Sequence, residues 1–267
     1  MRLAWAFLKR DALIALSYRA SFAAGLTGNL MLLVVFYFVG KLIDPSVSPA
    51  LAPYGGNYLA FMLIGLALTD CVGVSLTTFA GQIREGQLTG TLEATLMSPA
   101  RLPVILAYSS LWSYCFSAFR FVLYVVVGGV LYGVSLRSAN LRSALAIFVL
   151  TVLCFAGVGV LWASVVMLLK RGEALLATAG LIVILLSGVV FPTSLLPAWL
   201  QRVAAAVPLT HALDGMRLAL LHGDGFRELA GTLLALAAFA AGLLALGFGA
   251  FGAAVRIAKR HGSLVEY

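Results

Sequence analysis

The side chains that most often perform chemistry are few and scattered in this sequence. Its histidines and cysteines are His211, His222, His261, Cys71, Cys115 and Cys154. They form neither a CxxC pair nor an HExxH motif, so their spacing favours no metal site and no disulfide framework. The phosphate loop GxxxxGK[ST] and the nucleophile elbow GxSxG are missing, and no GxGxxG follows a predicted strand. We therefore predict no catalytic residue and no bound metal in this chain.

Two ionisable residues inside long apolar runs are the strongest candidates for a polar function. Asp70 lies in the run 58–80 and Arg120 in the run 104–133. An unpaired charge at the centre of a membrane helix costs at least ~2.5 kcal/mol. We therefore expect Asp70 and Arg120 to form an intramembrane pair or to line a substrate pathway. The alternative is that one of them faces the membrane interface.

Helices in a bilayer must position these two residues, because the composition does not suit water. Hydrophobic residues make up 62% of the 267 residues and charged residues only 10%, against about a quarter charged in soluble domains. A membrane-spanning helix needs about 20 apolar residues. Six runs reach this length, at residues 22–43, 58–80, 104–133, 144–169, 174–191 and 229–255. We predict an all-α integral membrane protein with six transmembrane helices, in a single transmembrane domain over residues 1–267.

The basic residues flank these runs and predict the orientation. On the side of the N-terminus lie Arg2, Lys9, Arg10, Arg19, Arg84, Arg101, Lys170, Arg171, Arg256, Lys259 and Arg260. The opposite side holds a smaller set, Lys41, Arg137, Arg142, Arg202, Arg217 and Arg227. Both termini are therefore predicted to be cytoplasmic, in a multi-pass protein of the inner (cytoplasmic) membrane. The net charge of +8 forms no basic domain, so nucleic acid is not an expected partner.

Residues 1–19 have the pattern of a helix lying on the membrane surface. Leu3, Phe7 and Ile14 share one helical face, while Lys9 and Arg10 lie on others. This pattern predicts an N-terminal interfacial helix in contact with the lipids of the cytoplasmic leaflet. The alternative is a cytosolic extension of the first membrane helix.

The segment 82–102 is the most polar stretch between two apolar runs and is predicted to be cytoplasmic. Gly86 and Gly90 are expected to end any helix that continues from the run 58–80. A short helix can begin at Thr91, because Glu93 would then lie in its first turn, where the helix dipole favours an acidic residue.

This short helix would present an apolar ridge. Leu88, Leu92 and Leu96 recur every four residues, and Pro99 disfavours helix at the residue before it. An amphipathic helix held away from the membrane has the shape to dock into a groove of another protein. The alternative is that the ridge packs against the membrane surface.

Residues 192–228, before the last apolar run, are predicted to form an external re-entrant segment. Prolines divide the segment into short helices, one of which has an apolar side; the residues concerned are Pro192, Leu196, Pro197, Trp199, Leu200 and Pro208. Broken backbone at membrane depth is tolerated only where protein or a water-filled cavity shields it. We therefore expect these short helices to lie at the external membrane boundary and to gate a pathway.

Two stretches of the sequence resemble the permeases of ABC type-2 transporters. The run Gly90-Thr91-Leu92-Glu93, followed by Leu96 and Pro99, is similar to the family's cytoplasmic signature, although Thr95-Leu96 stands where two leucines are common. Residues 187–200 and 208–217 are similar to the family's external segment before the last span. The predicted layout of six spans agrees with the same family.

The resemblance implies that this chain is the membrane subunit of an ATP-driven exporter and not itself an enzyme. It assigns the contact with the ATPase to Arg84, Glu85, Thr91, Leu92, Glu93, Leu96 and Pro99. The implied partners are two ABC ATPase subunits, which would hold ATP and Mg, and a second copy or homologue of the permease. The implied substrate is amphipathic: a lipid, a lipid-linked glycan or a hydrophobic drug-like compound.

Two other functions fit the same six spans. One is haem-related or other export by an ABC permease. The second, from a different class, is an ATP-independent channel or a membrane assembly factor.

Overall fold

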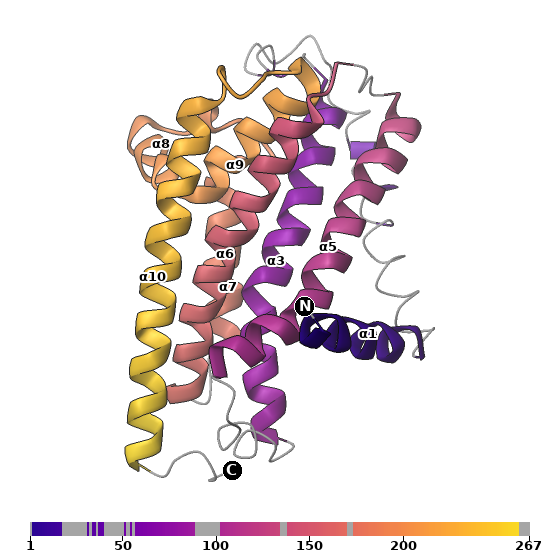
Figure 1. The fold of residues 1–267 in the computed structure, drawn as a ribbon. Helices are drawn as coiled ribbons and strands as arrows, with labels where there is room; N and C mark the ends of the chain where they lie inside the picture. The colour runs from indigo at the N-terminus through magenta and orange to yellow at the C-terminus, as the bar shows by residue number, and fades with distance from the viewer. Residues whose placement is uncertain are drawn as a thin grey trace.

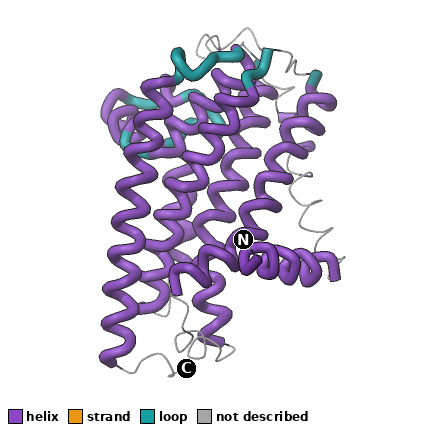
Figure 2. The backbone as a smooth tube through the Cα atoms, in the orientation of Figure 1, coloured by secondary structure: helices purple, strands orange, loops and turns teal. Residues whose placement is uncertain are grey.

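The computed structural model is an all-helical bundle. It describes residues 2–17, 31, 34–35, 37–39, 51, 54, 57–88, 102–133, 138–169 and 173–261. Within these ranges every regular element is a helix and no strand occurs. Figure 2 shows the long helices as nearly parallel rods, with described loops gathered at one end of the bundle. The prediction of an all-α protein is confirmed.

Four long helices form the bundle, in the order α10, α6, α3 and α5 across Figure 1. They are α3 (Tyr58–Leu88), α5 (Leu102–Tyr132), α6 (Leu141–Leu169) and α10 (Ala230–His261). Each contains a stretch of at least 25 residues that is apolar enough to cross a membrane. The chain is therefore a multi-pass membrane protein.

The first and fifth predicted spans differ from these four. Most of the run 22–43 lies outside the described residues, so its span stays a prediction. In the run 174–191, α7 covers only Glu173–Leu186. Its 14 residues rise about 21 Å, less than the ~30 Å thickness of the hydrocarbon layer. The helix ends early because Gly188 takes a left-handed conformation, with φ 78°.

The N-terminal helix α1 (Arg2–Ser17) lies across the direction of the bundle, beside α5 (Figure 1). The rings of Phe7 in α1 and Tyr108 in α5 stack with centroids 6.2 Å apart. Trp5 and Ile14 stay exposed. The helix expected over 1–19 is thus present, and its contact with lipid remains a proposal.

Helix α3 is longer than the sequence predicts. The expectation that Gly86 ends it is wrong, because α3 continues through Gly86 to Leu88. A glycine inside a helix costs only about 1 kcal/mol relative to alanine. Packing of the neighbouring turn, where Ile83 is fully buried, opposes this cost. Residues 89–101, which include Gly90, lie outside the described residues.

Close approach of two helix backbones joins α6 to α10. A Cβ atom at Gly157 of α6 would lie 2.6 Å from the carbonyl carbon of Leu243, and one at Gly247 of α10 would lie 2.5 Å from the oxygen of Gly157. Small residues let membrane helices approach this closely, and packing then replaces the hydrophobic effect that lipid does not supply. The α6–α10 pair is therefore in direct backbone contact.

We expect Gly157→Val to destabilise the protein by about 1–3 kcal/mol, because the side chain would meet the backbone of α10. Thermal unfolding of the purified protein in detergent measures the change. Gly249→Val is the matched control: Gly249 also lies in a long helix, but an added Cβ there meets no atom within 4 Å. Equal melting temperatures for the two variants would contradict the close crossing.

Candidate functional site

Short helices connect α7 to α10 at the end of the bundle remote from the chain's C-terminus (Figure 1). They are the 3-10 helix η3 (Thr193–Leu195), α8 (Ala198–Ala205), α9 (Pro208–Arg217) and the π-helix η4 (Leu218–His222). The three prolines stand at the helix starts: Pro192 precedes η3, Pro197 precedes α8 and Pro208 is the first residue of α9. Their fixed φ and missing N–H suit these positions. We call η3, α8 and α9 together the cap; the sequence predicts that it is external.

The segment from the end of η3 through α8 carries an exposed apolar stripe. Leu195, Trp199 and Val203, spaced four residues apart, are 61%, 63% and 45% exposed. Leu196 and Leu200 are half-buried and do not belong to this stripe. The structure therefore divides the predicted apolar side between a face turned to the surroundings and a face turned to the protein.

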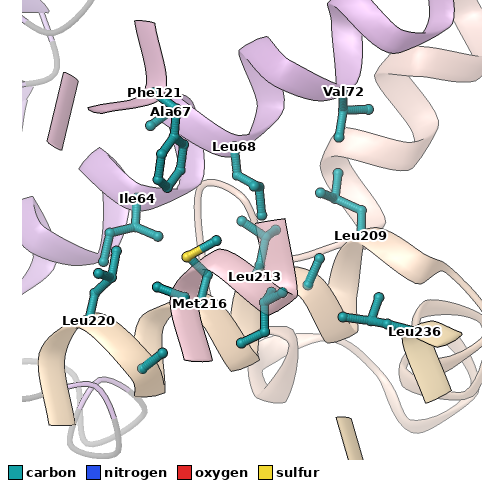
Figure 3. Close-up of a cluster of buried hydrophobic side chains, with 14 of the residues drawn as sticks. Ile64, Ala67, Leu68, Val72, Phe121, Leu209, Leu213, Met216, Leu220 and Leu236 are labelled. Atoms are coloured by element: carbon teal, nitrogen blue, oxygen red, sulfur yellow. The ribbon is translucent and has the colours of Figure 1, made fainter. Parts of the chain in front are cut away.

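Helix α9 is buried in the main core of the protein. Its Leu209, Leu213 and Met216 are fully buried and pack in the same cluster as Ile64 and Leu68 of α3 (Figure 3). The break in the membrane helices after α7 is thus shielded by protein, as broken backbone in a bilayer requires.

Arg217, the last residue of α9, is the most completely buried charged side chain among the described residues, at 1% exposed. Its Nη2 donates to the carbonyl oxygens of Gly188 at 3.0 Å and Val189 at 3.2 Å. Nε and Nη2 also reach the carbonyl oxygen of Phe61 in α3, both at 3.3 Å. Its Cζ lies 3.3 Å from the centroid of the Phe61 ring, a cation–π contact. One guanidinium therefore joins α9, α3 and the turn after α7.

Asp214 and Tyr54 complete this cluster. The Tyr54 hydroxyl donates to Asp214 Oδ1 at 2.8 Å, and the same oxygen lies 4.0 Å from Arg217 Nη1. Burial lowers the pKa of Arg217 to about 10, so it remains charged at neutral pH. Burial raises the pKa of Asp214, and the hydrogen bond from Tyr54 and the charge of Arg217 oppose that rise. A buried cation is thus held by carbonyl dipoles, an aromatic face and one carboxylate.

Gly65 of α3 makes room for the cluster. A Cβ at this position would lie 2.6 Å from the oxygen of Val189 and 3.0 Å from Arg217 Nη2. Sequence reasoning counted Arg217 only as an external basic residue within the family-like segment. The available signal was Asp214, three residues earlier, because residues at i and i+3 of a helix can pair.

Asp70 and Arg120 lie together on the facing helices α3 and α5. Arg120 Nη2 is 3.0 Å from Asp70 Oδ2, and the side chains are 12% and 18% exposed respectively. The Arg120 guanidinium also lies over the ring of Phe116, 5.2 Å from its centroid. Further along the same two helices, Ser109 donates to Gln82 at 2.9 Å. Polar contacts therefore join α3 to α5 at two levels.

The predicted ATPase-contact residues are only partly described. Arg84 and Glu85 lie in the last two turns of α3. The other five, which lie outside the described residues, are Thr91, Leu92, Glu93, Leu96 and Pro99.

Over the described ranges, no group of three His, Cys, Asp or Glu residues is placed to hold a metal ion.

Long apolar helices around a buried polar cluster, with a shielded break before the last span, define a polytopic membrane protein. Residues 2–221 match the model of one family, ABC-2 type transporter. The chain therefore belongs to the ABC-2 type transporter family. It is the membrane subunit of an ABC transporter, and its partner is an ABC ATPase. A comparison with curated proteins gives no match.

We expect the Asp70–Arg120 contact to appear as coupling in a double-mutant cycle. Asp70→Asn and Arg120→Gln should each destabilise the protein more than the double variant does, because each alone leaves one charge in an apolar setting. Melting temperatures in detergent measure the coupling, expected at about 0.5–3 kcal/mol. Asp70→Asn combined with Arg202→Gln, on the exposed surface of α8, is the additive control. Additivity in both cycles would show that Asp70 and Arg120 do not interact.

Proposed function

We propose that this chain is the transmembrane subunit of an ATP-driven exporter, which moves an amphipathic substrate outward. The observation that carries the proposal is membership of the ABC-2 type transporter family, together with the coupling signature at Thr91 to Pro99. A lipid, a lipid-linked glycan or a hydrophobic drug-like compound is the proposed substrate class. Two such chains, or one chain and a homologue, pair with two ATPase subunits in the inner membrane, with both termini cytoplasmic.

The ATPases supply the energy in this proposal, and the chain converts it into movement. ATP and Mg bind in the ATPase subunits, and this chain holds no cofactor. Closure of the ATPases pushes on the short helix expected to begin at Thr91 and to end before Ser98. The continuous helix α3 ends at Leu88, just before that segment, and reaches Tyr58 at the other end of the bundle. A helix of 31 residues is about 46 Å long, so α3 can carry movement across the whole membrane.

We predict that Leu92→Asp combined with Leu96→Asp abolishes ATP-driven transport while the protein still inserts in the membrane. The reason is that an unpaired charge buried in an interface costs several kcal/mol. The assay is co-purification of a tagged permease with its ATPase, followed by ATP hydrolysis and substrate release in proteoliposomes. The permease purified alone should hydrolyse no ATP.

Ala94→Asp combined with Ser98→Asp is the matched control for this prediction. It places the same two charges, also four residues apart, away from the ridge, because Ala94 lies on the opposite face of the expected helix and Ser98 follows its end. Assembly and transport should survive in this control. Normal transport in the Leu92/Leu96 variant would refute the docking ridge, and ATP hydrolysis by the permease alone would refute the division of labour.

The external segment 192–228 forms the exit gate in this proposal. Its support is the cap, in which Pro192, Pro197 and Pro208 begin the short helices and α9 is sealed into the core. The stripe of Leu195, Trp199 and Val203 faces lipid at the level of the headgroups, where the amphipathic ring of a tryptophan is favoured.

Single cysteines at the end of η3 and along α8 test this placement in a background that lacks the native cysteines at 71, 115 and 154. A membrane-impermeant thiol reagent added outside should label positions 201, 202 and 205 well. It should label positions 195, 199 and 203 poorly, because lipid covers them. Labelling solely from the cytoplasmic side would reverse the topology. Strong labelling at all six positions would show that α8 stands in water.

A further inference from the structure

We propose that Arg217 is the latch of the cap: it holds the cap against α3 in the closed state and lets go when α3 moves. The assignment of the closed state to a transport cycle rests on the proposed function. The latch itself rests on the contacts of one buried side chain and on the elements that these contacts join.

The bonds of Arg217 reach acceptors on two separate elements. Gly188 and Val189 lie in the turn after α7, and their carbonyl oxygens accept from Arg217. Phe61 belongs to the first turn of α3. These elements are far apart in the sequence. Phe61 and Arg217 are 156 residues apart in the chain, and Gly188 and Arg217 are 29 apart. The guanidinium bridges them, and its charge makes each bond stronger than a neutral one.

A change of helix type lies immediately beside the latch. Arg217 ends α9, and the next residue begins the π-helix η4, which runs from Leu218 to His222. π-helical turns are rare and are frequent at functional sites. Each residue turns an α-helix by about 100°, so a shift of one residue at this boundary would swing Arg217 away from its acceptors. The helix type therefore supplies a way to open the latch without unfolding α9.

Beside the ring of Phe61, a glycine brings the backbone of α3 close to the latch. At Gly65 the backbone of α3 faces the oxygen of Val189 and the guanidinium of Arg217 directly. Because α3 continues from this point to Leu88, a displacement at its cytoplasmic end arrives at the contact of Phe61 with Arg217. The latch and the expected ATPase contact therefore lie at opposite ends of helix α3.

Ser187 offers a reporter inside the closed cap. Its side chain is 1% exposed, and its hydroxyl has no hydrogen-bond partner among the described residues. Cysteine is nearly isosteric with serine, so Ser187→Cys in the background lacking cysteines at 71, 115 and 154 should fold normally. A small impermeant thiol reagent added outside should label it slowly while the latch is closed.

Arg217→Gln should raise the labelling rate of the cysteine at 187 by at least about tenfold, because several charge-assisted bonds are lost. Gly65→Ala is a second variant that keeps Arg217, and its methyl group would push against Val189 and the guanidinium. Gly73→Ala is the matched control in the same helix, since an added Cβ there meets nothing within 4 Å. Arg202→Gln controls for the loss of one external positive charge.

The readout specific to a latch is the response to ATP in the assembled transporter. With Arg217 present, ATP should accelerate labelling at 187. In Arg217→Gln, labelling should already be fast and ATP should add little. Labelling in folded Arg217→Gln and Gly65→Ala proteins that equals that of Gly73→Ala would overturn the latch. If both variants label fast but ATP has no effect on the parent protein, the latch stands and the proposed coupling to the ATPase falls.

Discussion

The constraint on which the rest of the structure depends is that backbone carbonyls freed inside a membrane protein must find donors. Helix α7 stops after 14 residues, and the chain then turns at Gly188. In lipid, each carbonyl left without a partner would cost several kcal/mol. The side chain of Arg217 supplies these donors. Helix α9 must be buried and correctly oriented to bring that side chain to the carbonyls. The early end of α7, the cap and the burial of α9 therefore depend on one another, because together they provide donors for these carbonyls.

Placing a cation in this position has a second effect, because it connects regions that the chain itself leaves apart. The partners of Arg217 are an aromatic ring and a carbonyl at the start of α3, the end of α7, and Asp214, which Tyr54 also holds. A buried charge fixed by several partners tolerates few alternative arrangements, because each partial set leaves some of them unsatisfied. Such a cluster is either complete or broken. That property suits an element which must have two distinct states.

The sequence was sufficient for the class of fold but not for this cluster. Apolar runs predicted α3, α5, α6 and α10 because their length and composition need no tertiary information, and the prolines marked the starts of the short helices. Two local rules failed. Gly86 was expected to break a helix that packing keeps intact, and the helix at α7 ended earlier than its hydropathy suggested. Arg217 was counted as an external charge, because its carbonyl partners lie up to 156 residues away and only the pairing with Asp214 could be expected from the local sequence.

The glycine crossing of α6 and α10 determines which parts of the bundle can move. Where Gly157 and Gly247 put two backbones in contact, no side-chain rotamer can change to let one helix slide past the other. Gly159 of α6 makes the same kind of contact with α3, because an added Cβ there would clash with the backbone oxygen of Ser75. Helices α3, α6 and α10 therefore form one frame whose members cannot easily slide past one another. Helix α3 meets α5 through a salt bridge and a side-chain hydrogen bond, contacts that can exchange partners during small shifts. Among the four long helices, α5 is therefore the one whose contact with the frame can shift most readily, while α3, α6 and α10 keep their arrangement.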